Sequence, residues 1–245
     1  MIQNLHSHTY YSFCGTDRPE KVIEAAIRGG IHLFGICDHN YDIGFQHPSM
    51  KFENENERLK LYQTALQRYQ DHITAVAEKY NDDIRLVCGV EVCTLDRGNT
   101  LLPANVDISM FDYCLIEHLD CEDTHIGDLF SFAKRCGCKH KGVAHTDIPR
   151  FLKKNKSDIF NFFHRMAQEN IFWELNVNFD SIHGFHEHEY VKQFWGNAEL
   201  IDIVRQSGVS LSVGFDGHRV EDYKPERVRD ACRKLEDLNI PMVRI

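Results

Sequence analysis

Histidine is unusually frequent in this chain, which holds 15 histidines among 245 residues. Many of them stand beside acidic or amide residues in short motifs that are far apart in the sequence. These motifs are HSH at 6–8, DH at 38–39, GVE at 89–91, EH at 117–118, AH at 144–145, ELN at 174–176 and FDGH at 215–218. Neutral imidazole and carboxylate are ligands that suit Zn²⁺, Fe²⁺ or Mn²⁺. The motifs therefore predict a metal site, provided that the fold brings them together.

The spacing within the motifs also points to metal chemistry. Residues i and i+2 of a strand face the same way, so His6 and His8 can bind one ion together, as can Asp216 and His218. A carboxylate such as Glu91 has two oxygens and can bridge two ions. Bridged ions about 3.5–4 Å apart generate hydroxide at neutral pH and stabilise both oxygens of a displacement at phosphorus. This chemistry suits phosphoester hydrolysis without a serine or cysteine nucleophile.

Each of these motifs follows a short apolar run. The runs are mostly continuous instead of alternating, which is typical of parallel strands covered on both faces. The predicted strands are 1–5, 32–37, 84–92, 113–117, 141–144, 171–177 and 209–215. A single histidine is more often a surface or core residue than a ligand. A ligand-type residue at the end of every strand is difficult to explain that way.

Helical patterns separate the strands. We predict helices over 18–28, with Pro19 in its first turn, over 157–168 with Ser157 as the cap, and over 225–238. A longer apolar stripe occupies every third or fourth position from Leu59 to Tyr80. We interpret the stripe as one face of a long helix packed on its own sheet, the alternative being a coiled-coil dimer.

Strand–helix alternation repeated about seven times indicates an α/β fold, either a (β/α) barrel or an open doubly wound sheet. No GxGxxG or GxxxxGK[ST] motif follows a strand, so the usual nucleotide-binding signatures are missing. We expect one domain over residues 1–245. In a parallel barrel the carboxyl ends of the strands converge on one face, which would gather the motifs into one site.

Composition narrows the possible partners. The 28 Lys and Arg against 37 Asp and Glu give a net charge of −9, which argues against binding long nucleic acids. No apolar run approaches the roughly 18 residues of a membrane span. The nine cysteines form no CxxC pair and follow no secretory signal, which favours a reduced, cytoplasmic protein. A small phosphorylated substrate remains the expected partner.

The motifs resemble those of the polymerase-and-histidinol-phosphatase (PHP) superfamily across nearly the whole chain. The matching segments are HSHTYYS at 6–12, ICDHN at 36–40, GVEV at 89–92, IEHLD at 116–120, AHTD at 144–147, ELN at 174–176 and GFDGH at 214–218. The long helix before GVEV is most similar to the histidinol-phosphatase branch. The resemblance implies a distorted, TIM-like (β/α)₇ barrel with two to three divalent ions (Zn, Fe or Mn).

The resemblance also implies how the ligands divide among three ions. The first ion would take His6, His8, Glu91 and Asp216, and the second would share Glu91 and add His118 and His145. The third would take His39, His218 and the residue at position 14. The family usually has His or Asp there, whereas this chain has Cys14. A Cys14 thiolate is a competent zinc ligand; alternatively it is an unused loop thiol, and a neighbour such as Asp17 substitutes for it.

Residues for substrate and catalysis are less well marked. The histidinol-phosphatase branch tends to have a glycine and a basic residue after ELN, and residues 177–181 offer neither. Arg150 matches a branch position suited to phosphate, or it is a solvated arginine at the start of a helix. Arg219 and Asn176 are further candidates for substrate contacts. Asp38 either protonates the leaving alkoxide or orients a ligand histidine. The histidine-rich segment 183–188 is interpreted as a lid or as a polar loop.

These observations predict a metal-dependent phosphatase for a small phosphomonoester, which the resemblance identifies as L-histidinol phosphate, an intermediate of histidine biosynthesis. A hydroxide bridging the metals would attack phosphorus, and the ions with Arg150 would stabilise the developing charge. A phosphodiesterase or exonuclease acting on nucleotides or short oligonucleotides is the main alternative. A non-catalytic regulatory or metal-storage module is the third.

Overall fold

A computed structural model describes residues 1–46, 50–97 and 100–245 of the chain. Its centre is a sheet of seven strands in which each strand pairs in parallel with the next one along the chain. The strands are β1 (Gln3–Asn4), β2 (Leu33–His39), β3 (Arg85–Cys93), β4 (Tyr113–Glu117), β5 (His140–Val143), β6 (Ile171–Asn176) and β7 (Leu211–Gly214). All seven lie within two or three residues of the predicted positions. β1 is the least regular, with two residues where five were predicted.

The sheet closes because its first and last strands lie side by side. The backbone N–H of Leu5 donates to the carbonyl of Val213 at 3.0 Å, and that of Asp216 donates to the carbonyl of His6 at 2.8 Å. Ser7 and Gly217 continue the contact as a parallel bridge. The result is a nearly closed, distorted (β/α)₇ barrel, which confirms the predicted fold class and excludes the open doubly wound sheet.

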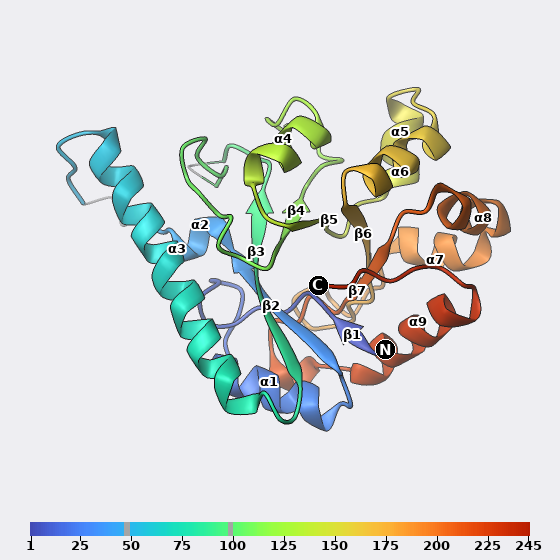
Figure 1. Ribbon diagram of the computed structural model, residues 1–245, viewed down its shortest axis with the longest axis horizontal. Helices are drawn as coiled ribbons and strands as arrows, with labels where there is room; N and C mark the ends of the chain where they lie inside the picture. Colours follow the sequence, from blue (N-terminus) through green and yellow to red (C-terminus); the bar gives the residue numbers. More distant parts are fainter. Residues whose placement is uncertain (47–49, 98–99) are drawn as a thin grey trace.

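Helices surround the barrel (Figure 1). They are α1 (Pro19–Arg28), α2 (Asn40–Ile43), α3 (Glu55–Ala77), α4 (Leu129–Cys136), α5 (Ile148–Lys154), α6 (Ile159–Gln168), α7 (Glu189–Gly196), α8 (Ala198–Ser207) and α9 (Pro225–Asp237), with short 3₁₀ turns η1 (Glu78–Tyr80) and η2 (Val220–Asp222). The predicted cap at Ser157 is wrong, because α6 is capped by Asp158, whose side chain accepts from the N–H of Asn161 at 2.7 Å. None of the described helices is long and apolar enough to cross a membrane.

The apolar stripe of α3 is buried against the chain's own core. Tyr62, Leu66, Tyr69, Ile73 and Val76 are at most 3% exposed and belong to the large cluster between the helices and the barrel. The interpretation of a long helix packed on its own sheet is therefore confirmed.

The barrel interior is apolar at the end where the strands begin. Tyr113 fills much of it, and its hydroxyl donates to the carbonyl of Leu5 at 2.7 Å. A Cβ on Gly35 or Gly89 would lie 2.2–2.3 Å from the Tyr113 side chain, so both glycines make room for that ring. Val243, near the C-terminus, packs into the same cluster. The chain end thus packs against this side of the barrel (Figure 1).

Candidate metal centre

Strand alternation places carboxylates inside the barrel at the ends of three strands. On β4 the inward series begins with Tyr113 and Leu115, and the next residue on that face is Glu117. The same two-residue period leads from Val87 to Glu91 on β3 and from Phe172 to Glu174 on β6. Glu91, Glu117 and Glu174 are at most 2% exposed. Buried carboxylates need positive partners, because an isolated charge in a protein interior is costly.

Four side chains form a first ligand group, consisting of His6, His8, Glu91 and Asp216. The Nε2 atom of His8 lies 3.0 Å from Asp216 Oδ1 and 3.2 Å from Nε2 of His6. His6 Nε2 lies 3.3 Å from Glu91 Oε1, and His8 Nε2 lies 3.4 Å from Glu91 Oε2. Two ligands bound at about 2.0–2.2 Å and 90–110° to one ion lie roughly 3.0–3.5 Å apart. The spacing of the four predicted ligands therefore fits one divalent ion.

Glu91 also faces the other predicted ligands. Its Oε1 lies 3.0 Å from Nε2 of His145, and its Oε2 lies 3.0 Å from Nδ1 of His39. Burial raises the pKa of Glu91, but the neighbouring His6 and His39 outweigh burial and hold it well below its ordinary value. This carboxylate has a different set of imidazoles at each oxygen, as a bridging ligand requires.

Glu117 was not predicted as a ligand and extends the site beyond Glu91. Its Oε2 lies 2.9 Å from Nε2 of His118, and its Oε1 lies 3.6 Å from Nδ1 of His39. His118 thus meets Glu117 directly and lies 5.9 Å, ring to ring, from His145. Burial and the charge of Glu91 raise the pKa of Glu117, but the hydrogen bond from His118 and the nearby imidazole of His39 lower it to about 2.

Two buried atoms in this part of the site lack an aligned hydrogen-bond partner among the described residues. They are Nδ1 of His39 and Oε1 of Glu117. Buried polar atoms in native proteins are nearly always satisfied, so such a pair calls for a partner of another kind. A cation fits, because a metal ion accepts electron pairs from imidazole nitrogen and carboxylate oxygen alike.

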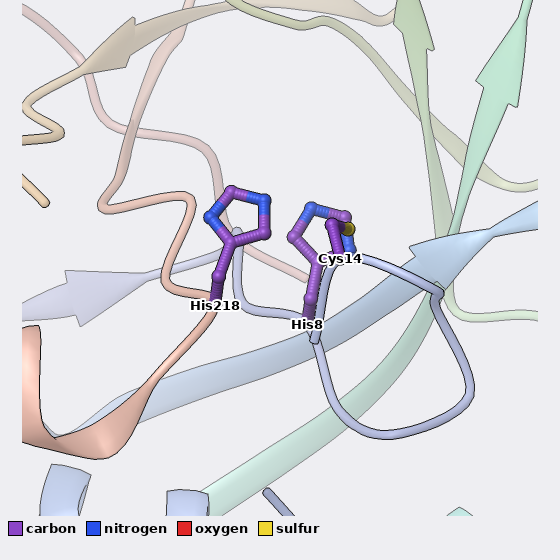
Figure 2. Close-up of side chains that lie close together, drawn as sticks. All are labelled: His8, Cys14 and His218. Atoms are coloured by element: carbon purple, nitrogen blue, oxygen red, sulfur yellow. The ribbon is translucent and has the colours of Figure 1, made fainter. Parts of the chain in front are cut away.

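Cys14 lies close to His218, with which it was predicted to bind the third ion. Figure 2 shows its side chain beside His8 and His218, and the ligand atoms of these three residues lie within 4.8 Å of one another. Burial raises the pKa of the Cys14 thiol, but hydrogen bonds with His218 and His39 lower it below its ordinary value. Asp17, the alternative, is engaged elsewhere, because its Oδ2 accepts from the N–H of Val220 at 2.7 Å and its Oδ1 pairs with Lys21.

Buried acceptors hold several of these imidazoles by their Nδ1 atoms. Glu174 accepts from Nδ1 of His6 at 2.8 Å and from the backbone N–H of His145 at 2.8 Å. Nδ1 of His8 lies 3.1 Å from the hydroxyl of Ser12. A partner at Nδ1 fixes the ring orientation and leaves the Nε2 lone pair to face a metal.

The structure brings Asp38 close to the centre without pointing it inward. Its Oδ1 accepts from the N–H of Thr9 and the hydroxyl of Ser12, and its Oδ2 accepts from the hydroxyl of Thr9, each at 2.7 Å. Ser12 in turn holds His8. Of the two predicted roles, this geometry favours orientation of a ligand histidine over protonation of a leaving group.

The three predicted substrate residues lie in different surroundings. Asn176 is fully buried, with its amide nitrogen 3.4 Å from both Glu174 and Asp216, so it braces carboxylates. Arg150 is exposed on α5, and among the described residues its side chain makes no ion pair. Arg219 is half-buried beside Ser7, and its Nε has no aligned partner among the residues described.

Sequence reasoning missed three residues of the segment after β6. The fully buried Asp180 lies 2.9 Å from Nδ1 of His183 and 3.0 Å from Nδ1 of His218. His188 stacks on His145 with ring centroids 6.1 Å apart. The density of histidines in 183–188 was the available signal, but no pattern indicated which of them turn inward.

Three residues of the candidate metal centre have strained backbone conformations. His118, His145 and Asp216 have φ values of 63°, 21° and 53°, a region that residues with a Cβ rarely occupy. Surrounding bonds hold these conformations, among them the one from the Asp216 N–H to the His6 carbonyl. Strain of this kind is concentrated at functional sites, where the chain must aim a side chain.

Comparisons with known proteins agree with the barrel fold and with the motifs that form the site. The sequence pattern of a family described as the PHP domain matches residues 4–235. A histidinol phosphate phosphatase from Lactococcus lactis subsp. lactis Il1403, solved with zinc, L-histidinol and phosphate, superposes with a TM-score of 0.60 at 15% identity, covering 99% of this chain and 95% of that one. At that identity the likeness shows the fold.

Two other solved structures are similar at a lower level. One is an archaeal ribonuclease P with mature tRNA, with a TM-score of 0.44 at 12% identity over 96% of this chain and 90% of that one. The other is a Listeria monocytogenes protein assigned as a histidinol phosphatase, with a TM-score of 0.41 at 15% identity over 98% and 93%. No curated protein matches the chain.

Proposed function

The chain belongs to the PHP domain family, and on this basis we propose that it is a metal-dependent phosphatase for a small phosphomonoester, with L-histidinol phosphate as the substrate. The observation that carries the proposal is the donor set at the carboxyl ends of the strands. Imidazoles and carboxylates meet there at separations that fit shared divalent ions. A phosphoric-ester hydrolase of this kind needs no side-chain nucleophile.

The residues fit divalent metal ions in type as well as in spacing. His6, His8, Glu91 and Asp216 would hold one ion, and Glu91 with His145 and His118 a second. When bound, such ions lower the pKa of water and stabilise negative charge on phosphoryl oxygens. We propose Zn²⁺, Fe²⁺ or Mn²⁺, since nitrogen and carboxylate oxygen suit all three.

Cys14 enters this proposal as a ligand of a third ion, together with His39 and His218. A thiolate is a soft donor, so its presence favours Zn²⁺ at that position over Mn²⁺. Metal analysis of Cys14→Ala beside the wild-type protein tests the assignment. We expect the variant to lose zinc at this position, and an unchanged zinc content would overturn it.

The surrounding residues would prepare the site before substrate arrives. Glu174 fixes His6 and the backbone of His145, and Asp38 with Ser12 fixes His8. Fixed imidazoles need no reorganisation when charge develops, which is the main way that polar sites accelerate reactions. Arg150 lies on α5, which follows directly after His145, and we propose that its guanidinium binds the phosphate, with Arg219 as a second cation.

The test measures phosphate release from L-histidinol phosphate beside a panel of phosphomonoesters, with Zn²⁺, Fe²⁺ or Mn²⁺ supplied in turn. We expect turnover that is strongest with L-histidinol phosphate and is abolished by a chelator and by Glu91→Gln. Arg150→Ala should raise KM more than it lowers kcat, whereas Lys153→Ala, a matched exposed cation of α5, should change neither.

Two results would contradict the proposal. Hydrolysis of bis-p-nitrophenyl phosphate in preference to the monoester would indicate a phosphodiesterase. Metal-loaded protein that is inert toward both ester classes would indicate a non-catalytic module.

A further inference from the structure

We propose that His183 is a further ligand of the metal centre, binding through Nε2 on the Oδ2 side of Asp216. The inference rests on the metal centre of the proposed function but not on its substrate. His183 belongs to the segment between β6 and α7, outside every motif of the family resemblance. Its side chain is 33% exposed, so the ring reaches both the centre and the solvent above it.

Asp180 holds the ring of His183 by its Nδ1 atom. Asp180 Oδ1 lies 2.9 Å from Nδ1 of His183, and its Oδ2 lies 3.0 Å from Nδ1 of His218. A carboxylate only accepts, so both Nδ1 atoms carry the proton and both Nε2 atoms have a free lone pair when the rings are neutral. One buried carboxylate thus presents two imidazoles in the form that binds metals, as Glu174 does for His6.

The Nε2 atom of His183 faces the carboxylate of Asp216. Nε2 of His183 lies 3.8 Å from Oδ2 of Asp216. When His183 is neutral, both atoms are electron-pair donors and repel each other at this distance unless a cation lies between them. The separation is too long for a hydrogen bond but is within the roughly 4.2 Å that two ligands of one ion can span. Asp216 Oδ1 is occupied on its other side by the imidazoles of the first ligand group.

The segment that holds Asp180 and His183 is attached to η2 and α9. Ser181 donates from its backbone N–H to Asp222 at 3.2 Å, and Arg227 donates to the carbonyl of Val177 at 2.9 Å. The Lys224 ammonium lies 4.3 Å from the ring centre of Phe179. These contacts attach the residues before and after Asp180 to η2 and α9. The fold therefore fixes the segment in a position from which His183 faces Asp216.

A pair of substitutions separates ligation from a merely structural role. In His183→Asn the amide N–H can still reach Asp180, but no atom takes the place of Nε2. In His183→Ala both functions are lost. The matched control is His186→Ala, because His186 lies three residues away in the same segment, is exposed, and has no described side-chain hydrogen bond.

The readout is metal binding and not turnover. Each protein is loaded with Co²⁺ or Zn²⁺, titrated with a competing chelator, and its metal content and cobalt absorption spectrum are recorded. We expect His183→Ala and His183→Asn to weaken the least tightly held ion by at least about 10-fold and to alter the cobalt spectrum, with His186→Ala like the wild type. An anomalous-scattering structure should place an ion beside His183 Nε2.

Three outcomes would overturn the inference. The first is unchanged metal affinity in both His183 variants, and the second is a loss in His183→Ala that His183→Asn restores, which would indicate a structural role through Asp180. The third is an anomalous map with every ion remote from His183. The proposed function is judged separately: altered metal binding in a protein inactive on all esters would keep this inference and refute the phosphatase.

Discussion

Raising the pH should destabilise the metal-free protein, and His145 supplies the best-defined part of the effect. Its Nε2 lies 3.0 Å from Oε1 of Glu91. Burial lowers the pKa of His145, but the hydrogen bond and charge of Glu91 outweigh burial and raise it to about 9. In the unfolded chain a histidine has a pKa of about 6.5. The folded state therefore holds this proton more tightly than the unfolded state does.

The direction and size of the pH effect on the free energy of unfolding follow from this difference in pKa. Because the pKa is raised on folding, the stabilisation is fully present below pH 6.5 and is lost as the pH rises through 9. The full pKa difference corresponds to about 3.4 kcal/mol, of which about 2.6 kcal/mol disappears between pH 6.5 and 9. For His218 burial lowers the pKa, but Asp216 and the bond to Asp180 raise it to about 10. This second group acts in the same direction over a slightly higher pH range.

Urea unfolding at 25 °C measures the effect, using chelator-treated protein at pH 6.5, 7.5, 8.5 and 9.0. His145→Asn is the control, because it removes this proton while leaving the net charge of the rest of the chain unchanged. We expect the free energy of unfolding to fall more steeply with pH in the wild type than in the variant. Equal slopes, or a wild-type stability that rises over this range, would refute the reasoning. Metal affinity should change in the opposite direction, increasing with pH, because bound ions displace these protons.

Three substitutions test other parts of the structure. Gly89→Ala should lower the free energy of unfolding by at least about 1–3 kcal/mol, measured with urea, because its Cβ would lie 2.3 Å from the Tyr113 ring; an unchanged stability would show that the ring can move aside. Glu174→Gln should weaken zinc binding by about 10–100-fold in a chelator competition, since it disturbs the hold on His6, and wild-type affinity would contradict that role. Asp38→Asn should cost about 2–4 kcal/mol in thermal or urea unfolding, because three donors converge on this buried carboxylate.

The strands could be predicted because their chemistry is nearly uniform. A short, continuous apolar run such as 171–177 is typical of a parallel strand that is buried on both faces, and β6 lies at Ile171–Asn176. The short helices were harder to find. α4 and α5 begin after Asp128 and Asp147, whose side chains cap them. These caps are local signals, but a single Asp before seven or eight residues is too common in loops to predict a helix.

Only part of the candidate metal centre could be predicted from the sequence. Asp216 could be assigned because its motif follows the apolar run of β7, and His6 and His8 could be paired because residues two apart in an extended chain face the same way, although β1 itself ends at Asn4. The same rule would have found Glu117, two residues after the inward-facing Leu115. His183 could not be found in this way, because the direction of its side chain depends on contacts between its segment and residues of η2 and α9.

The charge inside the barrel explains why metal binding, proton binding and stability should be coupled in this protein. Glu91, Glu117, Glu174 and Asp216 are all at most 4% exposed, and each uncompensated buried charge costs several kcal/mol. In the metal-free state neutral donors such as the Asn176 amide and the backbone N–H of His145 supply part of the compensation. Protonated imidazoles supply positive charge, which is why the pKa of His145 is raised. Divalent ions supply the same charge from the same atoms, so an ion and these protons exclude each other. These four carboxylates are therefore balanced in part by exchangeable cations, which are protons on the imidazoles in the metal-free state and metal ions when they are bound. The carboxylates themselves raise the pH at which the two exchange.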